Sequence, residues 1–212
     1  MNDPSLSASH QQQRDSSTGV TVLSFSATPS TQTAVLTATV EGLATVTWQS
    51  SKASLQVDET QEALVIQVAL TFHRLHLAVD SLLQPLIDLE QQAVTDVALC
   101  YRIDRKDRAH WPRLFALMQQ LAGTRLQIAQ LLAELSYGHP DLPGPAAKLL
   151  RRLTKAAGLK SRLQHISDRY EALEDLYEGG VDRINDHRYW RDGHVLEVII
   201  IIALLAEALL LL

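Results

Sequence analysis

The C-terminal stretch Val195–Leu212 constrains the architecture of this chain more than any other segment. It reads VLEVIIIIALLAEALLLL, and its only polar side chains are Glu197 and Glu207. As a helix it would span roughly 27 Å, close to the ~30 Å hydrocarbon thickness of a bilayer. No face of such a helix is polar enough to meet water. We therefore predict a single transmembrane helix over 195–212 that holds the rest of the chain on one side of a membrane.

The N-terminal residues are not expected to act as an export signal. Residues 1–18 have no basic region followed by an apolar one, and Arg14 is balanced by Asp3 and Asp15, which argues against a secretory signal or a transit peptide. We expect insertion to use the C-terminal segment itself and the bulk of the chain to stay on the cytoplasmic or matrix side. The same residues are rich in Ser and Gln, which predicts a disordered tail over 1–18.

Charge and cysteine content exclude several classes of protein. The net charge is −5 and the pI is near 5.9, so we expect no nucleic-acid partner, since such domains are usually basic. A single cysteine, Cys100, excludes an intrachain disulfide and a zinc site built from several cysteines. We interpret Cys100 as a small residue on a helix face.

Residues 19–57 have the composition of short strands. They are rich in Thr, Val and Ser, with breaks at Pro29-Ser30 and Glu41-Gly42. Their rough alternation of apolar residues predicts a small antiparallel sheet with one face packed on the following helices. The four predicted strands are Val20–Phe25, Thr33–Val40, Leu43–Trp48 and Ala53–Val57.

From Glu59 the apolar spacing becomes three and four, which predicts helices. The first helix extends to Leu83, and Pro85 predicts a kink or break before a second helix. The expected apolar stripe of the second helix is Leu86, Leu89, Ala93, Val97 and Tyr101. Residues 102–110 form a charged connector.

Residues 111–194 contain two helical patterns joined by a short loop, which predicts two antiparallel helices, a helical hairpin. The first arm begins at Trp111-Pro112 and ends in a Gly- and Pro-rich loop over 138–145. The second arm continues into the C-terminal helix, with Gly179-Gly180 as its weakest place. Its apolar residues alternate by four and three, the spacing of a coiled-coil seam. This seam is Leu159, Leu163, Ile166, Tyr170, Leu173, Tyr177, Gly180 and Ile184.

The predicted fold class is α+β and predominantly α. A small N-terminal antiparallel sheet packs on long antiparallel helices, and a transmembrane helix follows. The predicted domain boundaries are a tail at 1–18, a β head with following helices at 19–110, the helical hairpin at 111–194 and the membrane helix at 195–212.

Polar residues in and beside the apolar helix are the first candidate site. Glu207 is either a hydrogen-bonding or proton-responsive group between helices, or a carboxylate that reaches the far headgroups. Glu197 is expected at the near interface. Aromatic and basic residues anchor membrane helices at the interface, and the candidates for this role are Arg188, Tyr189, Trp190 and Arg191.

Two further clusters have weaker functional interpretations. His73, His76 and Asp80 share a helix face and would supply three metal ligands. Nothing completes such a site, so we expect no metal or cofactor and interpret these residues as a solvated or interface edge. The basic cluster is expected to be a solvated helix face, with phosphate contact as the alternative. It comprises Lys148, Arg151, Arg152, Lys155, Lys160 and Arg162.

The run ISDRYEALEDLYEGGVDRINDHRYWRDGHVLEVIIII resembles the C-terminal end of the family named after "required for meiotic nuclear division" proteins. The resemblance covers mainly the C-terminal half. It departs from the family at Val198, where tryptophan is usual. It implies a membrane-bound protein, linked in mitochondria to organelle translation, and no catalytic residues. The matching positions are Asn185, His187, His194, Leu196, Glu197, Ile199 to Ile202 and Glu207.

These observations predict a non-enzymatic, membrane-anchored scaffold or adaptor with no catalytic residues. Its expected partners are the lipid bilayer and a second copy or another protein, bound through the helical hairpin. An oligomeric channel or transport component with Glu207 in the pore or helix interface is the alternative. A metal-dependent enzyme using His73, His76 and Asp80 is a third possibility.

Overall fold

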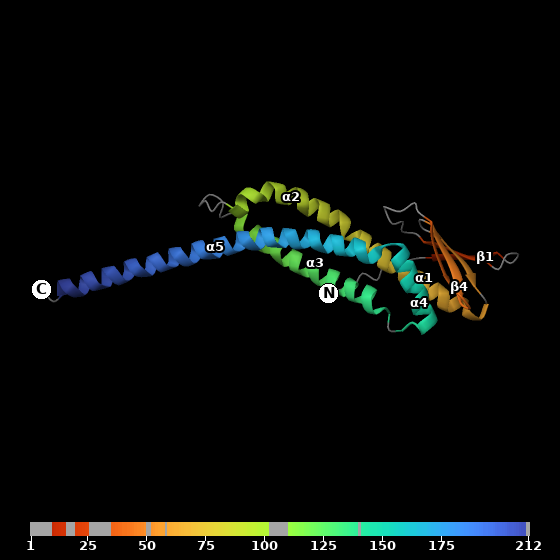
Figure 1. Cartoon of the computed structure of the whole chain (residues 1–212). Helices are drawn as coiled ribbons and strands as arrows, with labels where there is room; N and C mark the ends of the chain where they lie inside the picture. The colour runs from red at the N-terminus through yellow and green to blue at the C-terminus, as the bar shows by residue number, and fades with distance from the viewer. Residues whose placement is uncertain are drawn as a thin grey trace. The chain divides into compact units, whose positions relative to one another are not determined.

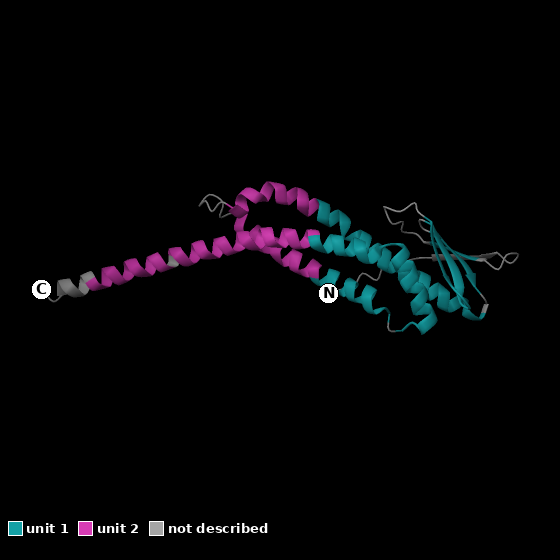
Figure 2. Ribbon diagram, in the orientation of Figure 1, with its two compact units in different colours: residues 1–87, 126–168 teal, residues 88–125, 169–212 magenta. Residues whose placement is uncertain are grey.

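The computed structural model describes residues 10–15, 20–25, 35–49, 52–57, 59–101, 110–139 and 141–210; of these, residues 10–15, 20, 25, 59, 192 and 205–210 are described by their backbone alone. The chain is predominantly helical, with a small N-terminal antiparallel sheet (Figure 1). It divides into unit 1, residues 1–87 and 126–168, and unit 2, residues 88–125 and 169–212 (Figure 2). Each unit combines two segments that are separated in the sequence.

The sheet of unit 1 has five strands in the order β1-β2-β5-β4-β3, and every neighbouring pair is antiparallel. Gly42, with φ of 73°, makes the tight turn between β3 and β4. The four predicted strands are confirmed. The strands are β1 (His10–Asp15), β2 (Val20–Phe25), β3 (Leu36–Val40), β4 (Ala44–Gln49) and β5 (Lys52–Val57).

Strand β1 corrects part of the predicted disordered tail. Residues 10–15 pair with β2 over their whole length, from His10 opposite Phe25 to Asp15 opposite Val20. Backbone hydrogen bonds to a neighbouring strand do not require apolar side chains, which explains why a Gln-rich segment forms a strand. The rest of 1–18, like the predicted turn at Pro29-Ser30, lies outside the described residues.

One face of the sheet is covered by helices α1 (Glu62–Ser81) and α4 (Gly144–Ala156), as predicted for the sheet (Figure 1). Alternate residues of the strands point inward, and Trp48 at the centre packs edge-on against Phe72 of α1 with ring centroids 4.9 Å apart. Burial of this apolar face is the main stabilising contribution to unit 1. The core includes Leu23, Val46, Leu55, Val68, Leu149 and Leu153.

The break predicted near Pro85 occurs at Leu82, between α1 and α2 (Leu83–Tyr101). Pro85 has no N–H to donate to the carbonyl of Ser81, four residues earlier, so the regular helix cannot continue through this point. The Leu82 N–H bonds the carbonyl of Val79, three residues back, and helical bonding resumes from Leu86 to Leu82.

Helix α3 (Trp111–Tyr137) begins and ends where predicted, and Gly138 follows it with φ of 82°. The second arm differs from prediction, because α4 and α5 (Leu159–Leu210) are separate helices. The break lies at Gly158, whose φ of 61° is a left-handed conformation that favours glycine. Gly179 and Gly180 are instead inside α5.

Unit 2 consists of segments of three helices whose directions follow from their contacts. The α2 contacts Glu90–Arg169 and Asp96–Tyr177 advance in the same direction along α5. In contrast, Trp111 at the start of α3 contacts His187, whereas Arg125, later in α3, pairs with Glu174, which lies earlier in α5. Thus α2 runs parallel to α5, and α3 runs antiparallel to it. All eight residues of the predicted seam on the second arm are buried or, for Gly180, in close contact.

Candidate functional site

The C-terminal part of α5 exposes apolar side chains on every side. Val198 to Ile202 are each at least 50% exposed, and successive helical residues are about 100° apart, so five of them cover all directions around the axis. Val195, Leu196 and Leu204 are also exposed. Covering these eight side chains would be worth on the order of 10 kcal/mol. The side chain of Glu207 lies outside the described residues.

The predicted interfacial anchors lie just before this apolar part. Tyr189 and Trp190 are 82% and 69% exposed. Arg188 lies over the ring of Trp111, 5.8 Å from its centroid, and His187 approaches the same ring edge-on. On the exposed surface, Nδ1 of His194 lies 3.1 Å from a carboxylate oxygen of Glu197. The structure therefore brings aromatic and cationic side chains together beside the apolar helix.

Among the described residues, one helical stretch, Glu62–Tyr101, satisfies the length and hydropathy criteria for crossing a membrane, and the C-terminal part of α5 is not among such stretches. Glu62–Tyr101 comprises α1 and α2, and 44% of its most apolar window is buried within the protein. Since α1 supplies core residues against the sheet, we assign this stretch to the interior of the fold.

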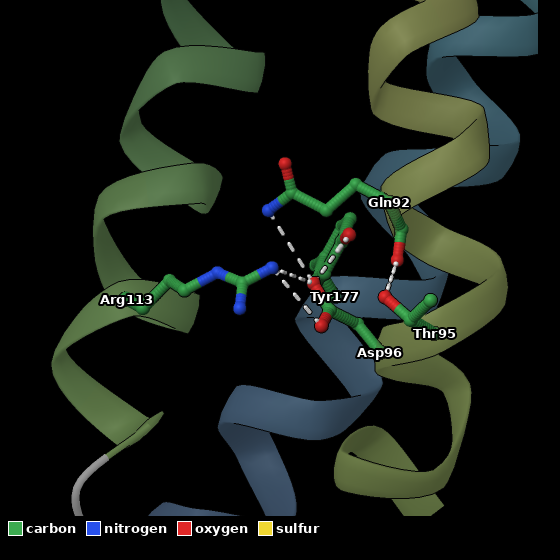
Figure 3. A network of polar contacts seen from close by, with 5 residues as sticks. All are labelled: Gln92, Thr95, Asp96, Arg113 and Tyr177. Carbon is green, nitrogen blue, oxygen red and sulfur yellow. Dashed lines mark hydrogen bonds and ion pairs between the residues drawn. The ribbon is translucent and has the colours of Figure 1, made fainter.

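A buried carboxylate links the three helices of unit 2 (Figure 3). Asp96 of α2 is only 2% exposed. Its Oδ2 accepts a hydrogen bond from the Tyr177 hydroxyl of α5 at 3.1 Å, and Arg113 of α3 donates to both its oxygens at 3.0 and 3.1 Å. The side-chain oxygen of Gln92 accepts a hydrogen bond from the Arg113 guanidinium at 2.7 Å. A buried charge held this way fixes the rotation and register of three helices at once.

The electrostatics of this network follow from burial. Burial, followed by the charge of Asp96, raises the pKa of the Tyr177 hydroxyl, so it stays a hydrogen-bond donor at any physiological pH. Burial and Asp96 also raise the pKa of the Cys100 thiol, which keeps it protonated and unreactive. Cys100 is buried as predicted, and its peptide oxygen accepts from Arg183 at 2.9 Å.

Sequence reasoning missed Asp96 because it followed the wrong apolar stripe on α2. The predicted stripe is right through Ala93, but Val97 is 41% and Tyr101 63% exposed. The inward positions after Ala93 are Asp96 and Cys100. Continuing the spacing of four and three from Leu89 would have reached position 96, and an acidic residue on a buried stripe is itself a signal.

The histidine cluster is buried rather than solvated, which corrects the prediction for His73, His76 and Asp80. Both histidines are 1% exposed, next to the aromatic rings of Trp48 and Phe72. His73 lies against Trp48 of β4, and His76 lies against Phe72 of α1 and Arg162 of α5, so neither ring meets water.

A guanidinium occupies the place where a metal would have to bind. Arg162 of α5 lies 3.2 Å from Nε2 of His76 and also donates to Asp80. The lone pairs that a metal needs are thus directed at a cation already, and a second positive charge there would be repelled. Among the described residues, no group of three His, Cys, Asp or Glu side chains is arranged to hold a metal ion.

Burial lowers the pKa of both histidines. Desolvation, followed by repulsion from His76, lowers the pKa of His73 to about 4. Desolvation also lowers the pKa of His76, opposed by the Asp80 carboxylate and aided by Arg162. Both imidazoles are therefore neutral at pH 7, and His76 presents a lone pair on Nε2 to the guanidinium.

Comparisons with protein-family models, with curated proteins and with solved structures gave no match. The resemblance of the C-terminal half to the "required for meiotic nuclear division" family therefore stays a prediction.

Proposed function

We propose that this protein is a membrane-anchored, non-enzymatic scaffold or adaptor. The observation that carries the proposal is the apolar part of α5, whose exposed side chains from Val195 to Leu204 face every direction. An apolar helix with no polar face is stable in lipid and unstable in water. In this proposal α5 continues as a single membrane-spanning helix through residues 195–212, with the bulk of the chain on the cytoplasmic or matrix side.

The side chains just before this segment support the same orientation. Tyr189 and Trp190 carry an apolar ring and a polar edge, which suits the boundary between headgroups and hydrocarbon. Arg188 and Arg191 would attract the phosphates of anionic lipids at that level. Glu197 would lie at the near interface with His194.

A scaffold also needs a surface outside the membrane helix to which a partner can bind. The seam residues of the second hairpin arm are already buried within the chain, so a partner cannot bind to them. The exposed apolar residues of unit 2 on α2 are Val94, Val97 and Tyr101, and their spacing places them on one face. We propose that a second copy binds this face, with the membrane helices brought together and Glu207 between them as a hydrogen-bonding group.

Flotation of the purified full chain with phosphatidylcholine vesicles tests the anchor. We expect the protein to float with the vesicles and to resist extraction by alkaline carbonate. The double variant Ile199→Asp/Ile202→Asp places two charges in the apolar segment, each costing roughly 3 kcal/mol near the centre of a span, and should not float. Gln164→Asp/His165→Asp adds the same charges at exposed sites of α5 and should float like the wild type. A wild-type chain that remains in the aqueous fraction as a monomer would overturn the proposal.

A further inference from the structure

The basic cluster separates in the structure into arginines that hold elements together and cations that line a cavity. Arg152 of α4 donates to the carbonyl of Thr39 in β3, and Arg162 of α5 donates to Asp80 of α1. These two arginines therefore have structural roles within unit 1. The remaining cations near the junction of α4 and α5 require another explanation.

Three of those cations, Arg151, Lys155 and Lys160, line one cavity of about 530 Å³ in unit 1. The described lining contains no carboxylate that would neutralise them. Arg151 and Lys155 are four residues apart on α4, a spacing at which like charges repel. This concentration of positive charge is local, because the chain as a whole carries a net charge of −5.

The rest of the lining suits an anion with an organic part. Thr154 and Ser161 contribute hydroxyl groups, and Leu135 contributes apolar surface from the end of α3. Gly158, in its left-handed conformation, turns the chain so that the end of α4 and the first turn of α5 border the same cavity.

We propose that this cavity binds a small organic phosphate. The phosphate is held by Arg151, Lys155 and Lys160, and the organic part lies against the Leu135 side. A volume of about 530 Å³ fits a ligand of drug size and not a polymer. None of the described lining residues is aromatic, so the stacking that holds single-stranded nucleic acid has no platform here. This site is independent of the proposed membrane anchor.

Calorimetric titration of the full chain in a non-ionic detergent tests the site. The ligands are phenyl phosphate, inorganic phosphate, phenol, short-chain dihexanoyl phosphatidate and a ten-nucleotide RNA. We expect phenyl phosphate to bind more tightly than inorganic phosphate, and phenol not to bind. Lys155→Gln/Lys160→Gln should weaken phenyl phosphate at least tenfold, because each lost charge-assisted hydrogen bond is worth about tenfold in affinity.

The matched control is Lys52→Gln/Lys148→Gln, which removes the same charge at exposed positions outside the cavity lining. It should bind phenyl phosphate within about twofold of the wild type. Ser161→Phe places a ring in the cavity lining without changing charge and should weaken phenyl phosphate more than inorganic phosphate. Circular dichroism checks that each variant is folded. A preference for phosphatidate would assign the phosphate to a lipid and keep the site.

Three results would overturn the proposal. The first is no binding of any phosphate compound by the wild type. The second is an equal loss of affinity for phenyl phosphate in the control and in Lys155→Gln/Lys160→Gln, which would indicate general electrostatic attraction and no defined site. The third is RNA that binds more tightly than phenyl phosphate with the same dependence on Lys155 and Lys160, which would indicate a nucleic-acid surface.

Discussion

Asp96 shows how a single residue can specify the packing of three helices. Asp96→Ala removes the acceptor for Tyr177 and Arg113 and leaves the buried Tyr177 hydroxyl unsatisfied. Because Arg113 is half exposed and can regain water, we expect a loss of about 2–3 kcal/mol in unfolding free energy, below the cost of breaking a fully buried pair. Urea unfolding followed by circular dichroism measures it. Tyr177→Phe should lose only about 1 kcal/mol, and an equal loss in both variants would contradict this account.

His73 makes the stability of the protein depend on pH. Its pKa in the folded state is about 4, below the value of 6.5 in the unfolded chain, so the unfolded chain binds a proton more readily. Stability is therefore full above pH 6.5 and falls as the pH drops towards 4. We expect a loss of about 2 kcal/mol between pH 7 and pH 5 from His73 alone.

The variant His73→Phe isolates this effect. It keeps a ring against Trp48 but has no titrating group, so its stability should fall less than that of the wild type over the same pH range. The difference between the two urea-unfolding curves at pH 7 and at pH 5 is the measurement. Burial also lowers the pKa of His76, so a smaller decline should remain in the variant. Parallel declines in the two proteins would refute the assignment to His73.

Alanine substitutions at Gly179 and Gly180 of α5 separate the effect of helix propensity on stability from the effect of helix packing. A Cβ on Gly180 would lie 3.1–3.2 Å from Sγ, Cα and Cβ of Cys100, so α5 and α2 could not keep their present approach. At Gly179 the nearest atom is the end of the flexible Arg183 side chain, 3.5 Å away. We expect Gly179→Ala to stabilise by up to about 1 kcal/mol through helix propensity. Gly180→Ala should destabilise by about 1–2 kcal/mol despite the same gain. Thermal unfolding of the two variants gives the comparison, and stabilisation by Gly180→Ala would be the contrary result.

The helices and strands were predictable from sequence to different degrees. Alternating Thr and Val residues predicted four strands, and Pro85 predicted the break between α1 and α2, because these signals act within a few residues. The break at Gly158 was missed, since the sequence does not reveal which glycine adopts a positive φ. The burial of His73 and the contact of Gly180 with Cys100 depend on residues far apart in the chain, and local spacing carries no information on them.

At the scale of the whole molecule, self-association should depend on the exposed apolar face of α2. Val94→Glu places a charge among Val94, Val97 and Tyr101 and should reduce dimers formed by a lysine-reactive cross-linker in native membranes by several-fold. Thr95→Glu adds the same charge about 100° away on the helix and should leave cross-linking unchanged. Monomer alone in the wild type would remove self-association from the proposed function and leave the anchor intact.

The division into units has a covalent consequence. Three helices continue from one unit into the other, with boundaries at 87–88 in α2, 125–126 in α3 and 168–169 in α5. A protease that cuts one of them leaves two peptide connections in place, so a single nick should not release either half. A force applied to the C-terminal end would likewise be transmitted to unit 1 through three segments of the chain and not through a single linker.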